Sequence, residues 1–209
     1  MKKLISVLLC LMMLFLCTAC SVAENIPDAT GAPAAESQSD AAGSNILVVY
    51  FAVAENSETD ATSSASVVTL NDVTSGKVTV LANAIRQKTG ADIFSIDTET
   101  VYPSNIMTLI DYAMGEQDDN ARPVILNAIE NMDQYDIIFV GYPLWWYDLP
   151  QVMYTFFDTY DLTGKTIIPF CTHNGSRFSG TIGIIEDLEP GATVIRDGYT
   201  AVSYTHLRA

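Results

Sequence analysis

Two strings of residues carry side chains that could hold a flat ligand. In the first, Leu144, Trp145, Trp146 and Tyr147 follow Pro143. Pro143 cannot donate to a β-ladder, so these four large side chains are expected on a loop where the chain leaves a strand. Aromatic faces bind flat apolar rings, whereas a hydrophobic plug over the sheet edge is the alternative. Two adjacent tryptophans favour the ligand.

The second string opens a loop rich in glycine and hydroxyl groups, and it consists of Thr172, His173, Asn174, Gly175 and Ser176. His173 could donate a hydrogen bond to a carbonyl group of a ligand or to a substrate, and a solvated histidine is an equal alternative. The preceding Cys171 is expected to be a small buried residue rather than a redox thiol, because His173 is the one basic residue near it in sequence.

Unbroken apolar runs predict the strands that position these strings. Residues 45–51 and 137–140 are too short for helices and rich in β-preferring types, so both are expected as strands buried on two faces of a parallel sheet. The second run is expected to end at Gly141. In such sheets ligands bind at the carboxyl ends of the strands, where both strings are expected. Further strands are predicted at residues 92–96, 166–171 and 192–195, with pairing ending near Pro169.

Helical spacing predicts the elements between these strands. The best marked helix has apolar residues at positions 78, 81, 82 and 85 and closes at Gly90. Residues 52–74 predict a long polar loop before it, so Thr74, Ser75 and Gly76 are expected at the N-terminus of this helix. The fold class is α/β, with a doubly wound parallel sheet of five strands. Other helical segments are predicted around residues 106–113, 124–129, 152–157 and 182–188.

Residues 1–20 are predicted to be a secretory signal. Lys2 and Lys3 precede an apolar segment that is short for a permanent span, and small residues precede Cys20. This end resembles a bacterial lipobox, in which the cysteine is lipidated, although Cys17 stands where that pattern usually has leucine. Ordinary signal cleavage is the alternative. Residues 21–44 contain almost no large apolar side chains and predict a flexible tether, and residues 45–209 predict one domain.

The charge of the chain limits its partners. Beyond residue 20 there are 25 acidic and eight basic residues, a net charge of −17 with neutral histidine. Nucleic acid and anionic lipid surfaces repel such a charge, so membrane contact is expected only through the N-terminal lipid. With Cys171 as the one cysteine of the domain, no disulfide framework is expected. Glu116, Asp118 and Asp119 are interpreted as a solvated acidic turn rather than a metal site.

The succession of strand, glycine turn, helix and aromatic loop resembles the flavodoxin-like family, from about residue 45 to residue 195. The most specific parts are GYPLWW at residues 141–146 and PFCTHNGS at residues 169–176, and KTGADIFSI at residues 88–96 adds weaker support. The resemblance implies three layers, strand order 2-1-3-4-5, and FMN with its phosphate on the first loop and its isoalloxazine ring between the other two. The binding residues that it implies are Thr74, Ser75, Gly76, Lys77, Val78, Pro143, Leu144, Trp145, Trp146, Tyr147, Thr172, His173, Asn174, Gly175 and Ser176.

The first loop departs from the family pattern. The family usually has a serine directly after Tyr-Phe and a Gly-Asn-Thr at the helix start, whereas this chain has Ala52, Lys77 and Val78. Each missing hydroxyl contact weakens binding by roughly 0.5–1.5 kcal/mol unless Ser75, Lys77 or the long loop substitutes for it. Tyr102 and the family's equivalent Tyr-Pro segment could lie beside the ligand, and an ordinary turn before a helix explains Tyr102 equally.

The leading hypothesis is an FMN-dependent redox protein tethered outside the cytoplasmic membrane of a bacterium. It would carry electrons between partners or reduce a small acceptor such as a quinone. The alternative is a non-catalytic lipoprotein that binds a partner or another planar ligand, and the altered first loop supports it. A receiver-type signalling domain is disfavoured because the first strand ends without an acidic pair for magnesium.

The end of the chain lacks the pattern that a doubly wound domain should show. Residues 196–209 make a poor helix, because polar and β-branched types dominate and no apolar face recurs at helical spacing. The covering helix that should follow the fifth strand is therefore expected to be missing, as in a C-terminally truncated domain.

Overall fold

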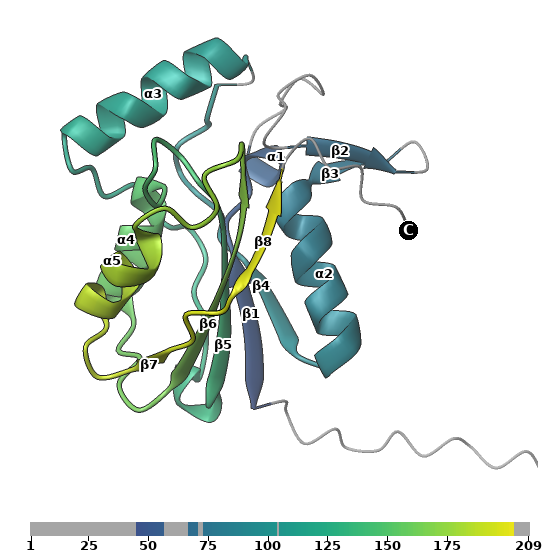
Figure 1. Ribbon diagram of the computed structural model, residues 1–209, viewed down its shortest axis with the longest axis vertical. Helices are drawn as coiled ribbons and strands as arrows, with labels where there is room; N and C mark the ends of the chain where they lie inside the picture. The colour runs from purple at the N-terminus through teal and green to yellow at the C-terminus, as the bar shows by residue number, and fades with distance from the viewer. Residues whose placement is uncertain (1–44, 57–66, 71–72, 104, 203–209) are drawn as a thin grey trace, which may run out of the picture. The chain divides into compact units, whose positions relative to one another are not determined.

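The apolar runs of the sequence form one parallel sheet in this computed structural model, which describes residues 45–56, 67–70, 73–103 and 105–202. The strand order is β4-β1-β5-β6-β7, which confirms the predicted order 2-1-3-4-5 (Figure 1). A further strand, β8, also pairs with β6, so β7 and β8 share the fifth position. The strands are β1 (Ile46–Tyr50), β4 (Asp92–Ser95), β5 (Ile137–Pro143), β6 (Thr166–His173), β7 (Thr193–Val194) and β8 (Tyr199–Val202).

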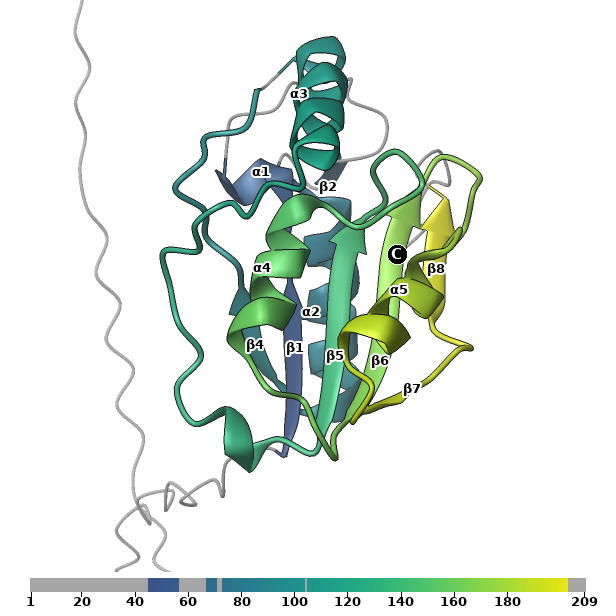
Figure 2. The ribbon, with the colours of Figure 1, turned by 90° about the vertical axis from the view of Figure 1, so that its left-hand side faces the viewer.

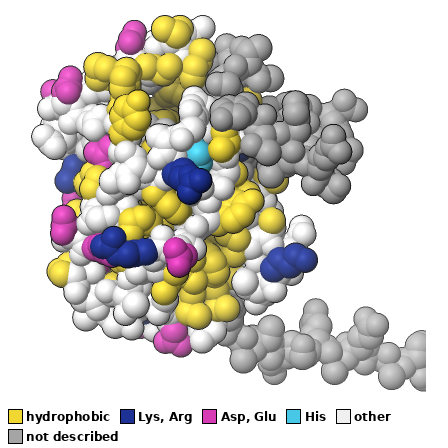
Figure 3. Space-filling model, in the orientation of Figure 1, with side chains coloured by type: hydrophobic (Ala, Val, Ile, Leu, Met, Phe, Trp, Pro, Cys, Tyr) yellow, Lys and Arg dark blue, Asp and Glu magenta, His cyan; other side chains and the backbone are white. Residues whose placement is uncertain are grey.

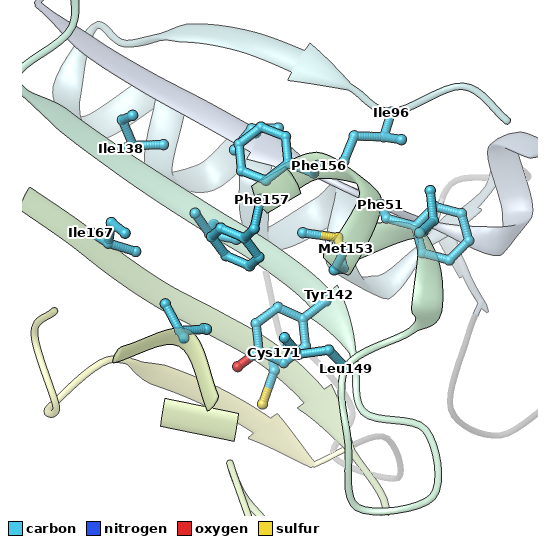
Figure 4. Packing of buried hydrophobic residues seen from close by; sticks show 14 of the residues in the cluster. Phe51, Ile96, Ile138, Tyr142, Leu149, Met153, Phe156, Phe157, Ile167 and Cys171 are labelled. Carbon is cyan, nitrogen blue, oxygen red and sulfur yellow. The ribbon is translucent and has the colours of Figure 1, made fainter. Parts of the chain in front are cut away.

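Helices cover both faces of the sheet. The helix α2 (Lys77–Thr89) lies on one face, and α4 (Gln151–Thr159) and α5 (Thr181–Leu188) lie on the other (Figures 1 and 2). Alternate residues of β1 enter two separate apolar cores, Leu47 on the α4 side and Val48 on the α2 side. The larger core packs α4 onto the central strands, as Figure 4 shows for Met153, Phe156 and Ile138. Burial on both faces is what a parallel sheet requires.

Several short elements gather at the carboxyl ends of the strands. The helix α1 (Val53–Asn56), the antiparallel pair β2 (Val67–Leu70) and β3 (Val73–Gly76), and α3 (Ile106–Asp118) lie at this edge (Figures 1 and 2). The predicted polar loop over residues 52–74 is therefore wrong where the structure describes it. The β-prone residues of β2 find partners in β3, with Val67 opposite Gly76.

The strand β5 does not end at Gly141, as predicted, but runs on to Pro143. Gly141 is required because the ring of Phe170, its partner on β6, lies across it. A Cβ atom on Gly141 would lie 2.1 Å from Cζ of Phe170. Glycine at position 141 leaves room for the Phe170 ring on the face of the sheet and does not break the strand.

The prediction that pairing ends near Pro169 is also wrong, because β6 pairs with β5 as far as Thr172. The carbonyl groups of Lys165 and Ile167 accept from β7 and the residue after it, so the backbone of Pro169 points to the same side. On that side the chain passes from β7 to β8, and Gly198 lies close against the Pro169 carbonyl. The nitrogen of Pro169, which carries no hydrogen, thus faces the gap between β7 and β8.

Between β4 and β5, one of the two predicted helical segments forms. In α3, the Asn105 side chain caps the helix by accepting from the amides of Met107 and Thr108. The segment around residues 124–129 is not helical, because the backbone of Ile125 forms an antiparallel bridge with Thr98. A short 3-10 helix, η1 (Met132–Gln134), precedes β5.

After β7 the described chain forms β8 (Tyr199–Val202). The sequence predicted that the covering helix after the fifth strand is missing, and the described residues after β7 form none. Residues 203–209, the signal over residues 1–20 and the tether over residues 21–44 lie outside the described residues. Among the residues that are described, no helix combines the length and apolarity needed to cross a membrane.

Candidate functional site

A cavity of about 600 Å³ opens at the carboxyl edge of the sheet. It lies between α3 and the loops that follow β5 and β6, so it brings together the two strings singled out from the sequence. We call it the ring cavity. None of the described residues that line it is charged, which suits an uncharged ligand surface. They are Ile106, Leu109, Ile110, Ala113, Leu144, Trp145, Trp146, Tyr147, Asn174, Gly175 and Ser176.

The aromatic string forms a tight turn over residues 145–148. The amide of Trp145 donates to the carbonyl of Asp148 (3.1 Å), and the amide of Asp148 donates to the carbonyl of Trp145 (2.8 Å). Between them, Trp146 and Tyr147 have φ angles of 46° and 65°. Two positive φ angles in succession are those of a two-residue hairpin turn, which usually takes asparagine and glycine. Large aromatic side chains are therefore held here in an unfavourable backbone conformation.

The three aromatic side chains of this turn have different environments. Trp145 is half-buried and packs edge-on against Phe51 and Tyr102, with ring centroids 5.7 and 5.4 Å away. Trp146 is 40 % exposed, and its Nε1 donates to the carbonyl of Ile110 on α3 (2.9 Å). Tyr147 is 68 % exposed. Trp145 thus belongs partly to the core, while Trp146 spans from the turn to α3.

Pro143, Thr172 and His173 lie at the ends of β5 and β6, directly before the residues that line the cavity. Thr172 accepts from the amide of Leu144 through its carbonyl oxygen (2.8 Å), which fixes the two loops side by side. Thr172 and His173 are each 1 % exposed. The alternative that His173 is a solvated side chain is therefore wrong.

His173 has one ring nitrogen in use. Its Nδ1 accepts from the amide of Gly175 (2.9 Å), so the proton of the neutral imidazole is on Nε2. Nε2 is buried and has no hydrogen-bond partner among the described residues. Burial, and then the charge of Arg177, lower the pKa of His173, which keeps the ring neutral at pH 7. Next to the cavity wall, but not in it, His173 therefore has a buried N–H donor for which the described residues provide no acceptor.

The predicted phosphate residues lie apart from the ring cavity. Thr74, Ser75 and Gly76 end β3, and Lys77 begins α2, so the helix start is where it was predicted. Gly76 packs closely on the end of β1, because a Cβ on it would lie 2.9 Å from Cβ of Ala52. The side chain of Val78 is 2 % exposed and belongs to the core, so only its backbone amide is available to a ligand.

One wall of the cavity was missed by reasoning from the sequence. Ile106, Leu109, Ile110 and Ala113 were recognised as one face of a helix, but such a stripe usually faces the core. In the structure Leu109 and Ala113 are buried, while Ile106 and Ile110 are half-buried and face the cavity. Figure 3 shows further hydrophobic surface at the upper left, over α3.

Behind the cavity, Tyr102 is a core residue and not a ligand neighbour at the surface, since it is 1 % exposed. Its hydroxyl donates to Oε2 of Glu116 (3.4 Å). Glu116 is 8 % exposed, so its assignment to a solvated acidic turn is wrong, whereas Asp118 and Asp119 are exposed as predicted. Burial raises the pKa of Glu116 to about 7, against a smaller opposite effect of the Tyr102 hydrogen bond.

Cys171 is fully buried, and burial raises the pKa of its thiol to about 12. A thiol in this state is not a nucleophile at neutral pH, which agrees with its predicted structural role. Among the described residues, no group of three or more histidine, cysteine, aspartate or glutamate side chains could hold a metal ion.

Comparison with known proteins places this geometry in a family. A family model described as flavodoxin matches residues 66–201. No curated protein matches the sequence. A candidate flavoprotein from Bacteroides uniformis is 24 % identical, with a TM-score of 0.58 over 77 % of this chain and 90 % of its own. One from Bacteroides eggerthii is also 24 % identical, with a TM-score of 0.56 over 77 % and 89 %. A flavoprotein from Lactobacillus acidophilus, solved in complex with FMN, is 17 % identical, with a TM-score of 0.56 over 76 % and 92 %. At these identities the solved structures show the fold alone.

Proposed function

The chain belongs to the flavodoxin family, and on that premise we propose that it binds FMN and acts as a redox protein. It carries electrons between partners or reduces a small acceptor such as a quinone. The observation that carries this proposal is the ring cavity, in which the loops after β5 and β6 meet at the carboxyl edge of the sheet. A relative of the same fold was solved with FMN, which supports the choice of cofactor.

The residues present fit an isoalloxazine ring. The cavity has the volume of a typical small-molecule site, and its aromatic and aliphatic walls match a flat ring. The buried Nε2–H of His173 lies one residue before the cavity wall and suits a carbonyl oxygen of the ring or of a substrate. A buried donor without a partner costs about 1–3 kcal/mol, and a bound carbonyl would remove that cost.

The start of α2 supplies a weaker anchor for the phosphate. Gly76 leaves the first amides of α2 without a side-chain cap, and such amides favour an anion. Ala52 and Val78 have hydrocarbon side chains, so neither offers a hydroxyl to the phosphate. Backbone amides, Ser75 and Lys77 would have to hold the phosphate.

When bound, FMN supplies the redox chemistry, accepting and releasing electrons at its ring. The chain contributes position and electrostatics. The turn over residues 145–148 and α3 shield the ring from water, and His173 orients it. The negative charge of the protein disfavours further negative charge on the ring and so lowers the reduction potential. No side chain need act as an acid or base.

The tether is the second part of this proposal, and its support is the sequence alone. Lipid on Cys20 would hold the domain outside the cytoplasmic membrane through residues 21–44. Replacing Cys20 with alanine is expected to move the protein from the detergent phase to the aqueous phase after phase separation. Unchanged partitioning of the Cys20→Ala protein would contradict lipidation.

A non-catalytic role is the second candidate, and the buried Val78 side chain favours it, because the family's hydroxyl contact at this position is gone. In that case the ring cavity would bind a partner or another planar ligand.

Titration with flavins separates these candidates. We expect the protein without residues 1–44 to quench FMN fluorescence and to bind FMN more tightly than FAD, because the helix N-terminus ends at a single phosphate. The purified protein should also absorb in the flavin bands. A folded circular-dichroism spectrum without quenching at high micromolar FMN would contradict FMN binding and favour the non-catalytic role.

A further inference from the structure

Asp148 closes the aromatic turn, and its carboxylate accepts hydrogen bonds from three segments. Oδ1 accepts from the amide of Leu149 (2.7 Å) and from the hydroxyl of Tyr154 on α4 (2.8 Å). Oδ2 accepts from Nε2 of Gln117 on α3 (3.2 Å). Hydrogen bonds to a carboxylate are stronger than those between neutral groups. One side chain therefore links the turn to α3 and α4.

The turn needs such support because its backbone is strained. Trp146 and Tyr147 both adopt left-handed conformations, which are unfavourable for residues other than glycine. The two backbone hydrogen bonds between Trp145 and Asp148 close the turn. Trp145 packs the turn onto the core and Trp146 joins it to α3, and the carboxylate of Asp148 adds hydrogen bonds to both α3 and α4.

The helix α3 depends on the same turn for part of its position. The ring cavity lies on one side of it, and a second cavity of about 440 Å³, lined by Tyr112, Gly115 and Glu116 among others, lies on another side. Apart from buried contacts such as those of Leu109 and Ala113, two hydrogen bonds from the turn reach α3. They join Trp146 Nε1 to the Ile110 carbonyl and Gln117 to Asp148.

The α4 end of the link is itself fixed. The guanidinium of Arg122 lies over the ring of Tyr154 (5.0 Å to the centroid) and pairs with Asp158 (2.6 Å). Burial, and then the hydrogen bond to Asp148, raise the pKa of Tyr154, so its hydroxyl stays a donor. Arg122 thus holds the Tyr154 ring in place, and the hydrogen bond from Tyr154 to Asp148 attaches the turn to α4.

We propose that Asp148 is the positioning residue of the ring cavity, an inference that rests on the proposed flavin binding. By holding the turn against α3 and α4, its carboxylate fixes one wall of the cavity, which Trp146 and the apolar residues of α3 form together. A flat ring fits between this wall and the loop after β6 only while the wall keeps its place. Asp148 itself does not line the cavity and acts through the turn.

The test compares Asp148→Ala with Asp148→Asn in the full-length protein. Asparagine keeps an acceptor for Leu149 and Tyr154, and its amide can pair with Gln117 once the Gln117 amide turns. Asp187→Ala on α5 is the matched control, because Asp187 is an exposed carboxylate. The probes are FMN and lumiflavin, which has the ring system without the phosphate.

We expect Asp148→Ala to weaken FMN and lumiflavin by the same factor, roughly tenfold or more, as loss of charge-assisted hydrogen bonds implies. Asp148→Asn should stay within about threefold of the parent protein, and Asp187→Ala should bind as the parent does. An equal loss for both probes identifies the ring subsite, whereas general damage would also disturb the phosphate anchor. Unchanged affinity of Asp148→Ala for both probes would overturn the proposal.

Hydrogen exchange without flavin decides the case if the parent protein binds neither probe. Asp148→Ala should then speed amide exchange in α3 and leave α2 unchanged, and equal exchange in α3 would overturn the proposal. Failure of flavin binding alone would remove only the proposed function. If Asp148→Ala loses protection in α2 as well, Gln117→Ala breaks the α3 link alone and must show the faster exchange in α3.

Discussion

The ring cavity and the start of α2 lie at the same edge of the sheet but offer different groups to a ligand. The cavity is made of side chains on α3 and on loops, and its aromatic residues match the pattern expected from the sequence. The start of α2 offers backbone amides, while the residues at its expected hydroxyl positions are Ala52, packed on Gly76, and the buried Val78. If the proposed function holds, the ring would be bound by side chains, whereas the phosphate would be bound mainly by backbone amides.

The largest effect should come from Trp145, whose edge-on contacts join the cavity to the core. Trp145→Ala removes packing against Phe51 and Tyr102, so the free energy of unfolding should fall by about 3 kcal/mol. Chemical denaturation without flavin measures it. Tyr147→Ala, in the same turn but 68 % exposed, is the control and should change stability by less than about 0.5 kcal/mol. Equal midpoints for the two variants would show that Trp145 is not part of the core.

Next in size is the pH dependence that Glu116 contributes behind the cavity. Its pKa is raised from 4.5 to about 7, so between these values the folded state holds a proton that the unfolded state has released. The free energy of unfolding must then fall as pH rises from 4.5 to 7, by at most about 3 kcal/mol. Glu116→Gln keeps an acceptor for Tyr102 and does not titrate, so its advantage over the parent should grow across that window. Parallel stability curves for the two proteins would show that the pKa of Glu116 is not raised in the folded state.

Trp146 should affect binding more than folding, in contrast to Trp145. It is 40 % exposed and lines the cavity, so Trp146→Ala should weaken FMN by about 1–3 kcal/mol. Fluorescence titration gives the affinity, and thermal midpoints should stay near those of Tyr147→Ala. If FMN affinity changes by less than about twofold, the aromatic turn covers the sheet edge and does not hold the ring.

The smallest effects are expected at the start of α2. Ser75→Ala should weaken FMN by roughly 0.5–1.5 kcal/mol and leave lumiflavin unchanged, because only the phosphate is concerned. The reverse change, Ala52→Ser, restores a family hydroxyl and should strengthen FMN by a similar amount. Isothermal titration with both ligands separates ring from phosphate. An equal change for lumiflavin would mean that the two regions are one site.

The sequence by itself predicted five strands of the parallel sheet and the two loops of the ring cavity, the family resemblance implied the strand order, and β2, β3 and β8 were not predicted. Short apolar runs rich in β-preferring types indicate buried strands, and a parallel sheet puts both loops at one edge. Seven of the predicted binding residues therefore line a single cavity. The start of α2 was equally readable, because its apolar stripe and Gly90 mark a helix from local signals.

Only the tertiary structure decided which side chains face a ligand and which face the core. The stripe on α3 reads the same whether it meets a core or a cavity, and a polar Glu116 gives no local sign that Tyr102 will bury it. Asp148 looks like any loop carboxylate until Gln117 and Tyr154, 31 and 6 residues away, bring their donors to it. The predicted ends of pairing at Gly141 and Pro169 were wrong because the effect of these residues depends on the neighbouring strand. Contacts between two strands cannot be inferred from the sequence of one strand alone.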